Sequence, residues 1–528
     1  MISKNKINTT KKYILIITTS FLILAALLLI KVFYYHEFVP DWDEANHLLM
    51  SYYYYSAINS GSLKVVANLF KDSNTIYPPL YHILTSFSYR LIHSWPYAAI
   101  LTNIPFILIL MLSVYGIGER LGNKKAGLLA ALLTPILPIF LTVQEKAAID
   151  YPSVSVFIAS FYLLFKTENF TNRKYSILFG LSIFAGLLIK WPFVIPAIPF
   201  VFYAIRSLYS SRHNRRPVAT NISLALLVLL PAISWYLFNH NSLVTKLSFF
   251  WNPNGFAQIL WSNPHGLNFQ NLLLYSFKSP LEPAGVGIIV LVFFYVSLFK
   301  VHKKYNERLL LLSIAITYIV LTFLDDKSSL YMIYTYPLAM ILILVTLYKI
   351  KGLRRDVLIV ILSISILTNF TLTQLNYSKR TQVFLADLLK DSIYILPNYD
   401  TKYIYGVWQT QNIVNFAYER GGCSENMLVF PDRRFLNPST VNFYIVSKGI
   451  NSFAMPAYAY YNPASDGYFD TSRLSSYQCI ISTTGDPGTF ANKEVLDQVN
   501  NYLLSHREYK LKTYSEPDGE TILLFIKI

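Results

Sequence analysis

Three carboxylates stand close together just after the first long apolar stretch of the chain. Asp41, Asp43 and Glu44 fall within the segment "DWDEANH", which ends on His47. Neighbouring carboxylates can serve as a general base and as the group that orients it. Because Asp also caps helices, a second interpretation makes Asp43 the cap of a helix that begins at Glu44. A cap does not explain three nearly adjacent acids, so we favour a functional cluster.

More charged residues stand at the ends of apolar stretches that face the same side of a membrane as this acidic segment. They are Lys146, Asp150, Lys190, Asp325, Asp326 and Lys327. Charged side chains in or beside a bilayer are costly to bury, so their presence there indicates a functional role. If the apolar stretches bundle, these side chains line one cavity. Two alternatives stay open: Asp150 also suits a helix cap, and Lys190 and Lys327 also suit lysines that extend to the interface.

Two further patterns near the acids have weaker meanings. Glu44 and His47 are three residues apart and could share a metal ion with Asp150, but Glu-x-x-His alone is a weak metal signal. The four tyrosines 52–55 are typical of an aromatic belt at a membrane interface, and they could also stack on a sugar.

The elements that must position these residues are membrane spans. The chain has 528 residues, 54% hydrophobic and 14% charged, whereas soluble globular proteins carry about 25% charged residues. We predict a polytopic α-helical membrane protein, because apolar stretches long enough to cross a bilayer recur. The sequence predicts eleven transmembrane helices, near 13–35, 97–117, 126–143, 151–167, 175–190, 191–207, 218–238, 283–300, 309–325, 331–349 and 357–373.

The basic residues predict the orientation of these spans. Short loops on one side hold 22 Lys and Arg residues, whereas the longer loops on the other side hold about 9, and this difference marks the first side as cytoplasmic. The net charge of +16 therefore reports topology and gives no evidence of a nucleic-acid partner. We predict a multi-pass protein of the plasma membrane with a cytoplasmic N-terminus. Its first span lacks a small-residue cleavage site and is interpreted as a retained anchor.

Three outer regions interrupt the helical pattern. The loop 36–96 contains two candidate helices, 44–60 and 80–93, that we expect to lie in the interface. A second outer loop covers 239–282. Residues 374–528 predict an extracytoplasmic α/β domain, beside a transmembrane catalytic domain over 1–373.

The C-terminal region contains short apolar stretches typical of strands. They lie at 403–408, 426–430, 441–447 and 478–483, followed by a helix over 493–506 and a hairpin over 509–528. Cys423 and Cys479 also lie here, on the side where a disulfide persists, and whether they pair stays open.

Several segments, taken in order, resemble the GT-C superfamily of glycosyltransferases. The protein O-mannosyltransferases and the bacterial lipid A aminoarabinose transferases are the most similar in kind. "DWDEANH" resembles the Asp-Glu motif of the first outer loop, and "YPPLYHILTSFSYRL" resembles a His-Pro-Pro-Leu-Tyr segment with Tyr77 in the His position. The other matching segments are "QEKAAIDYPSVSVF", "GLLIKWPFVIPAIP" and "DDKSSLYMIYTYPLAM". The resemblance covers roughly residues 13–350.

The resemblance implies an inverting transfer of a sugar from a polyprenyl-phosphate donor to an acceptor hydroxyl on the outer face. It implies Asp43 as general base with Glu44 orienting it, and Lys327, Lys190 and Lys146 on the donor phosphate. Asp150 and Asp41 become sugar-binding or second acids, and His47, Tyr77 and Tyr331 contact the acceptor. No cofactor is required on this interpretation, although a divalent cation stays open.

The acceptor can be a lipid, a polysaccharide or a protein, and we expect residues after 374 to influence its choice. The alternative function is a polytopic transporter or a flippase of lipid-linked sugars.

Overall fold

The computed structural model describes residues 2–34, 39–71, 77–93, 95–211, 215–244, 305–323, 329–375, 409–433, 435–457, 469–488, 493–516 and 519–528. Three predicted elements lie wholly or mostly outside these residues: the span 283–300, the strand 403–408 and the outer loop 239–282. The same holds for Asp325, Asp326 and Lys327.

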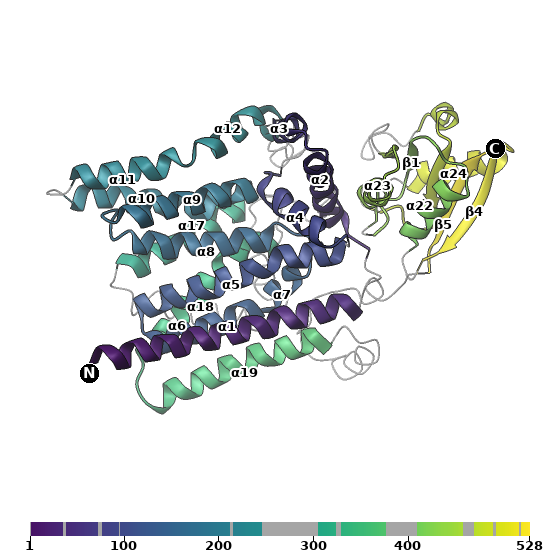
Figure 1. Ribbon diagram of the computed structural model, residues 1–528. Coiled ribbons are helices and arrows are strands. Elements are labelled where there is room, and N and C mark those ends of the chain that lie inside the picture. Colours follow the sequence, from purple (N-terminus) through teal and green to yellow (C-terminus); the bar gives the residue numbers. More distant parts are fainter. Residues whose placement is uncertain are drawn as a thin grey trace.

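A bundle of long helices forms the larger part of the molecule (Figure 1). It comprises α1 (Ile2–Tyr34), α5 (Trp95–Leu121), α6 (Lys124–Leu133), α7 (Pro138–Gln144), α8 (Asp150–Lys166), α9 (Arg173–Ile189), α10 (Val194–Ser210), α11 (Arg215–Leu227), α12 (Leu230–Phe238), α17 (Tyr305–Phe323), α18 (Thr335–Leu347) and α19 (Leu353–Leu375). Short 3-10 helices η1 (Thr134–Ile136), η2 (Trp191–Phe193) and η4 (Ser329–Tyr334) join some of them.

These helices are those of a membrane protein. Among the described residues, three helical stretches are by length and composition able to cross a bilayer alone: Lys11–Ile30, Tyr97–Leu121 and Trp191–Ser210. The pair α11 and α12 makes a fourth if its 41° bend lies within one span. The other predicted spans that fall within the described residues are also helical. How many times the chain crosses the membrane stays a prediction.

The predicted span 126–143 is not one continuous helix. The sequence predicts a helix over 126–143, whereas the structure divides it into α6, η1 and α7. Pro135 and Pro138 explain the breaks, because proline lacks an N–H and clashes with the preceding helical turn. After α7 the chain turns into the segment that carries Lys146.

Three short helices lie at one end of the bundle, namely α2 (Trp42–Asn59), α3 (Leu63–Lys71) and α4 (Leu80–Leu91) (Figure 1). The predicted helices 44–60 and 80–93 are confirmed as α2 and α4, whereas α3 was not predicted. Pro79 immediately precedes α4, where its fixed φ is compatible with a helix start. Their position in a membrane interface stays a prediction.

The described residues after 409 contain a five-stranded sheet. Its strands are β1 (Met427–Val429), β2 (Ala454–Pro456), β3 (Cys479–Thr483), β4 (Tyr509–Ser515) and β5 (Thr521–Lys527), in the order β2-β1-β3-β5-β4. The first three strands are parallel, and β5 is antiparallel to both neighbours. The helices are α22 (Thr410–Glu419), α23 (Pro438–Ser447), η6 (Thr471–Ser476) and α24 (Lys493–Ser505).

The strand predictions in this region are partly right. The predicted strands 426–430 and 478–483 and the hairpin 509–528 are confirmed as β1, β3 and the β4–β5 pair. Gly519 adopts a φ of +88° in the turn between β4 and β5, a conformation that glycine adopts readily. Strand β2 was not predicted.

The predicted strand 441–447 is wrong, because these residues belong to helix α23. Asn437 caps this helix by accepting a 2.9 Å hydrogen bond from the backbone N–H of Thr440, and Pro438 occupies its first turn. Val441 and Tyr444 are buried in a core shared with α2, so the apolar residues follow a helical period.

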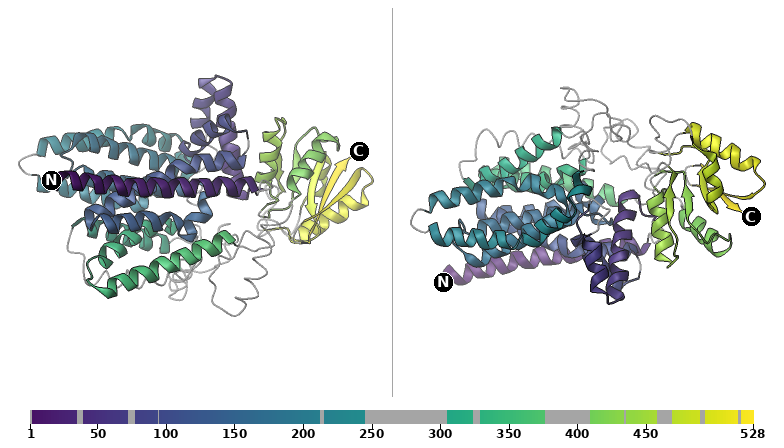
Figure 2. Two further views of the ribbon diagram at one scale, coloured as in Figure 1. Left: turned by 60° about the horizontal axis from the view of Figure 1, so that its bottom comes forward. Right: turned by 90° about the horizontal axis from the view of Figure 1, so that it is seen from above.

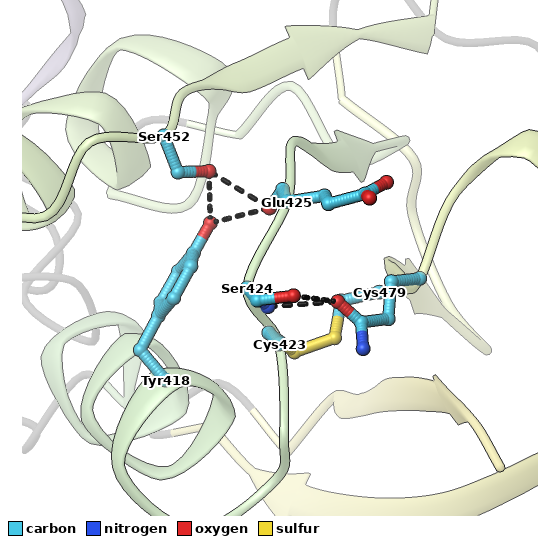
Figure 3. The surroundings of a disulfide bond; sticks show 7 residues. Tyr418, Cys423, Ser424, Glu425, Ser452 and Cys479 are labelled. Carbon is cyan, nitrogen blue, oxygen red and sulfur yellow. Dashed lines mark hydrogen bonds between the residues drawn. A yellow bond between two sulfur atoms is a disulfide. The ribbon is translucent and has the colours of Figure 1, made fainter.

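A disulfide joins Cys423 and Cys479, which answers the pairing question (Figure 3). Next to it, the backbone N–H of Ser424 donates a 2.7 Å hydrogen bond to the Gln478 side chain, and Tyr418 and Ser452 exchange one of 2.7 Å. The disulfide ties Cys423, which lies before β1, to the first residue of β3.

The sheet-containing region lies at the end of the bundle that carries α2 and α4, opposite the N-terminus, in all three views (Figures 1 and 2). One apolar cluster crosses the contact between the two parts. It includes Ala45 and Leu48 of α2 together with Leu436, Val441 and Tyr444.

Candidate active site

Asp41 is the N-cap of α2. Its Oδ1 atom accepts a 3.1 Å hydrogen bond from the backbone N–H of Glu44, and its Oδ2 atom lies 2.7 Å from Nζ of Lys146. The capping role that the sequence allowed for Asp43 therefore belongs to Asp41, and α2 begins at Trp42 rather than at Glu44.

Asp43 lies in the first turn of α2 with part of its surface exposed. The hydroxyl of Tyr77 donates a 3.2 Å hydrogen bond to its Oδ1 atom. Desolvation by the surrounding protein raises the pKa of Asp43, and the negative charges of Asp41 and Asp150 raise it further. The hydrogen bond from Tyr77 and the positive charge of Lys190 lower it. A carboxyl with a raised pKa is better matched to proton transfer near neutral pH.

Asp150 and Lys190 form a buried ion pair between the start of α8 and the end of α9. Asp150 is the first residue of α8 and does not cap it, since Ile149 takes that position without a side-chain bond. Lys190 is 8% exposed, and its ammonium group contacts Asp150 rather than pointing away from the protein. Lys327 lies outside the described residues, so for that lysine the alternative stays open.

Glu44 points into the protein from the same turn of α2. One carboxylate oxygen accepts a 2.8 Å hydrogen bond from the backbone N–H of Ala147. Burial, and then the charge of Asp41, raise the pKa of Glu44 to about 7, while Lys146 and the hydrogen bonds oppose this. The contact links α2 to the turn that carries Lys146.

His82 of α4 is a site residue that sequence reasoning missed. Its Nε2 atom lies 3.1 Å from Nδ1 of His47, and both rings are buried. The ring of His47 also packs edge-on against Tyr77, with centroids 4.5 Å apart. Burial lowers the pKa of His47 to about 3, so this ring is neutral near pH 7. A signal existed, because His82 follows the prolines of the segment "YPPLYHIL".

The structure thus brings together eight of the ten predicted site residues: Asp41, Asp43, Glu44, His47, Tyr77, Lys146, Asp150 and Lys190. Lys327 lies outside the described residues. Tyr331 falls within η4, which a 2.6 Å hydrogen bond between Ser153 and Tyr334 joins to α8.

The three residues suggested as metal ligands have other partners. Glu44 accepts from Ala147, His47 faces His82, and Asp150 pairs with Lys190. Within the described ranges, no group of three or more His, Cys, Asp or Glu side chains is arranged to hold a metal ion. These three residues therefore do not fit a shared cation, and dependence on a cation stays a prediction.

Solved membrane glycosyltransferases share this fold over nearly the whole chain. ArnT from Cupriavidus metallidurans, bound to undecaprenyl phosphate, matches with a TM-score of 0.58 at 12% identity, covering 96% of this chain and 97% of that one. The oligosaccharyltransferase of Archaeoglobus fulgidus in its apo form matches with a TM-score of 0.55 at 12% identity, covering 96% of this chain and 74% of that one. The fold is therefore that of the GT-C glycosyltransferases.

A family match supports the same class. Residues 77–235, less than a third of the chain, match the family described as dolichyl-phosphate-mannose-protein mannosyltransferase. A search of curated proteins finds no match. The family match and the fold confirm the resemblance to the GT-C superfamily that the sequence motifs predict.

Proposed function

We propose that this protein transfers a sugar from a polyprenyl-phosphate donor to an acceptor hydroxyl on the outer face of the plasma membrane, with Asp43 as general base. The GT-C fold supports a glycosyltransferase. ArnT, with undecaprenyl phosphate in its solved structure, supports a polyprenyl-phosphate partner.

The assignment of Asp43 as general base rests on how the three neighbouring carboxylates differ in their partners and exposure. Asp41 is engaged by the start of α2 and by Lys146, and Glu44 is buried against Ala147. Asp43 is exposed and, within the described part of the chain, accepts a hydrogen bond from Tyr77 without forming an ion pair. It is therefore the carboxylate that an acceptor hydroxyl can reach.

The reaction is a single displacement that inverts the sugar carbon. The acceptor oxygen forms a bond to the anomeric carbon while the bond from that carbon to the phosphate oxygen breaks. The acceptor proton passes to Asp43, and polyprenyl phosphate leaves with the electron pair of the broken bond. A base within hydrogen-bond reach typically contributes about 10²–10⁴-fold to such a step.

Lysines stabilise the charge that develops on the departing phosphate. Lys190 and Lys146 have Asp150 and Asp41 as partners, so the phosphate shares each ammonium group with a carboxylate. Lys327 is the third proposed phosphate ligand. Asp150 and Asp41 hold these lysines in place, and either carboxylate can also bind sugar hydroxyls.

The remaining predicted residues surround the base. Glu44 orients the turn that bears Asp43, and Tyr77 supports the Asp43 carboxylate through its hydroxyl. His47 and Tyr331 are proposed to face the acceptor. The sheet-containing region is proposed to be a domain on the outer side, where it meets lipid, polysaccharide or protein acceptors.

Purified wild-type protein and Asp43→Asn should be incubated with radiolabelled polyprenyl-phosphate mannose, glucose and aminoarabinose, with membrane extract as the acceptor source. We expect wild type to transfer or slowly release one sugar and the variant to lose at least 100-fold. Asp356→Asn is the matched control, because Asp356 is an exposed acid paired with Arg355. This control should keep wild-type transfer.

Two outcomes would contradict the proposal. Full activity of Asp43→Asn would remove Asp43 as base while keeping a glycosyltransferase. Failure of wild type to turn over any donor, together with movement of labelled lipid across proteoliposomes, would favour the transporter or flippase.

A further inference from the structure

The sheet-containing region holds the acidic segment on both sides of Asp41. The indole Nε1–H of Trp42 donates a 3.0 Å hydrogen bond to Oδ1 of Asp432. The hydroxyl of Thr440 donates a 3.0 Å hydrogen bond to the backbone carbonyl of Pro40. Asp41 lies between these two anchored residues, and Asp43 follows directly.

The anchoring residues are themselves rigidly placed. Asp432 is 3% exposed, and its backbone N–H donates a 2.8 Å hydrogen bond to the carbonyl of Pro487. Gly488 has a φ of +96°, and a Cβ atom there would lie 2.2 Å from the carbonyl oxygen of Asp432. Only glycine permits this approach, so the loops after β1 and β3 are locked together.

Thr440 is fixed in a comparable way. It lies in the first turn of α23, and the cap residue Asn437 also donates a 3.1 Å hydrogen bond to the carbonyl of Arg433. Asn437 therefore ties the first turn of α23 to Arg433, which directly follows Asp432. In open α/β sheets the carboxyl ends of neighbouring parallel strands are the usual edge for functional contacts.

Apolar packing reinforces the two hydrogen bonds. Val39, Ala45 and Leu48 are buried in the same cluster as Leu436, Val441 and Tyr444. The N-terminal half of α2 is consequently enclosed by the bundle on one side and by α23 on the other.

We infer that Asp432 is a positioning residue for the transfer reaction, acting through Trp42 to set the direction of Asp43. The inference rests on the proposed function and extends it. It assigns the sheet-containing region an effect on the chemical step, in addition to the effect on acceptor choice that the sequence predicts. A base displaced by about 1 Å can cost about 100-fold in rate, so a small shift of α2 is sufficient.

The kinetic test compares Asp432→Ala with Asp432→Asn at saturating donor and acceptor. Asp432→Ala should lower kcat by about 10- to 100-fold, with KM for both substrates changed less than threefold. Asp432→Asn should recover most of kcat, because its amide oxygen still accepts from the Trp42 indole. Glu419→Gln is the control, since it removes a surface ion pair with Lys448 in the same region.

A double-variant cycle tests the route of the effect. Trp42→Phe should lower kcat as Asp432→Ala does, and the double variant should be no worse than either single one. Additive losses would show that Asp432 acts independently of Trp42. A raised acceptor KM with wild-type kcat in Asp432→Ala would make Asp432 an acceptor ligand. Either result overturns the inference.

Hydrogen exchange separates failure of this inference from failure of the proposed function, because it needs no turnover. The amides of residues 41–49 should exchange faster in Asp432→Ala and in Thr440→Val than in wild type or Glu419→Gln. Unchanged exchange refutes the anchoring whatever the activity. Faster exchange in a protein that transfers no sugar would leave the anchoring intact and refute the function.

Discussion

The hydroxyl of Tyr77 donates a hydrogen bond of 3.2 Å to the carboxylate of Asp43. This contact joins the residue before Pro78 and Pro79 to the exposed acid at the start of α2. It lowers the pKa of Asp43, whereas desolvation of the carboxylate by the surrounding protein and two neighbouring negative charges raise this pKa.

Tyr77→Phe should therefore raise the pKa of Asp43. A general base works in its ionised form, so the acidic limb of the pH–rate profile should move to higher pH. The rate should fall most below neutral pH and least above it. The pH–rate profiles of wild type and Tyr77→Phe would check this, with Tyr53→Phe as the control because Tyr53 is exposed. An acidic limb at the same pH in Tyr77→Phe as in wild type would contradict the prediction.

Asp150→Asn should destabilise the protein strongly. Removing one partner of a buried ion pair leaves the other charge uncompensated, at a typical cost of 3–5 kcal/mol. Adding Lys190→Met should restore much of the lost stability but none of the activity. Thermal unfolding in detergent, followed through the loss of the monodisperse peak, measures the stability of both variants, and the sugar-transfer assay measures their activity. A single variant as stable as wild type would exclude a buried pair.

Stability should depend on pH through Glu44. The pKa of this carboxyl is raised from an unfolded value near 4.5 to about 7, so the folded state holds the proton more tightly. The resulting stabilisation is complete below about pH 4.5 and is lost as the pH rises through 7. Glu44→Gln still accepts from Ala147 and should flatten this fall in the melting temperature.

Glu516 provides a matched comparison for that prediction. Burial raises its pKa to about 7 as well, far from Glu44 along the chain. Glu516→Gln should remove a separate part of the fall in melting temperature with rising pH. The melting temperature of the double variant Glu44→Gln/Glu516→Gln should therefore depend least on pH. The raised pKa of Asp43 adds a contribution of the same sign, which remains in both variants. Equal slopes in wild type and double variant would contradict the assignment.

Replacing both cysteines by alanine should destabilise the sheet-containing region. The disulfide closes a loop with a sequence separation of 56 residues, and loss of a native disulfide typically costs 2–5 kcal/mol. Limited proteolysis should cut the variant within 409–528 at lower temperature than wild type. The mass difference between reduced and unreduced protein reports the bond itself, and its absence in wild type would refute the pairing.

The sequence predicts the convergence of charges better than their pairing. Asp41, Lys146, Asp150 and Lys190 share one end of the spans because burying a charge elsewhere is costly. The pairs Asp41–Lys146 and Asp150–Lys190 join residues 105 and 40 positions apart, so local patterns could not select them. Asp41 rather than Asp43 became the cap because α2 begins two residues earlier than its apolar period indicates.

Helix α23 shows why the local pattern misleads in the C-terminal region. Val441, Phe443, Tyr444 and Ile445 combine β-branched and aromatic side chains, which favours a strand over such a short stretch. The Asn437-Pro438 dipeptide was the contrary signal, since it suits a helix cap and a first helical turn. The decisive partner is α2, nearly 400 residues earlier, which no local window includes.

The bond between Trp42 and Asp432 has a consequence for biosynthesis. The two residues are 390 positions apart, so α2 leaves the ribosome well before its anchor exists. At about 5–20 residues per second this interval is roughly 20–80 s. During that time the acidic segment has only the bundle to hold it. If Asp432 positions Asp43 as inferred above, the base is aligned only after the sheet-containing region has folded.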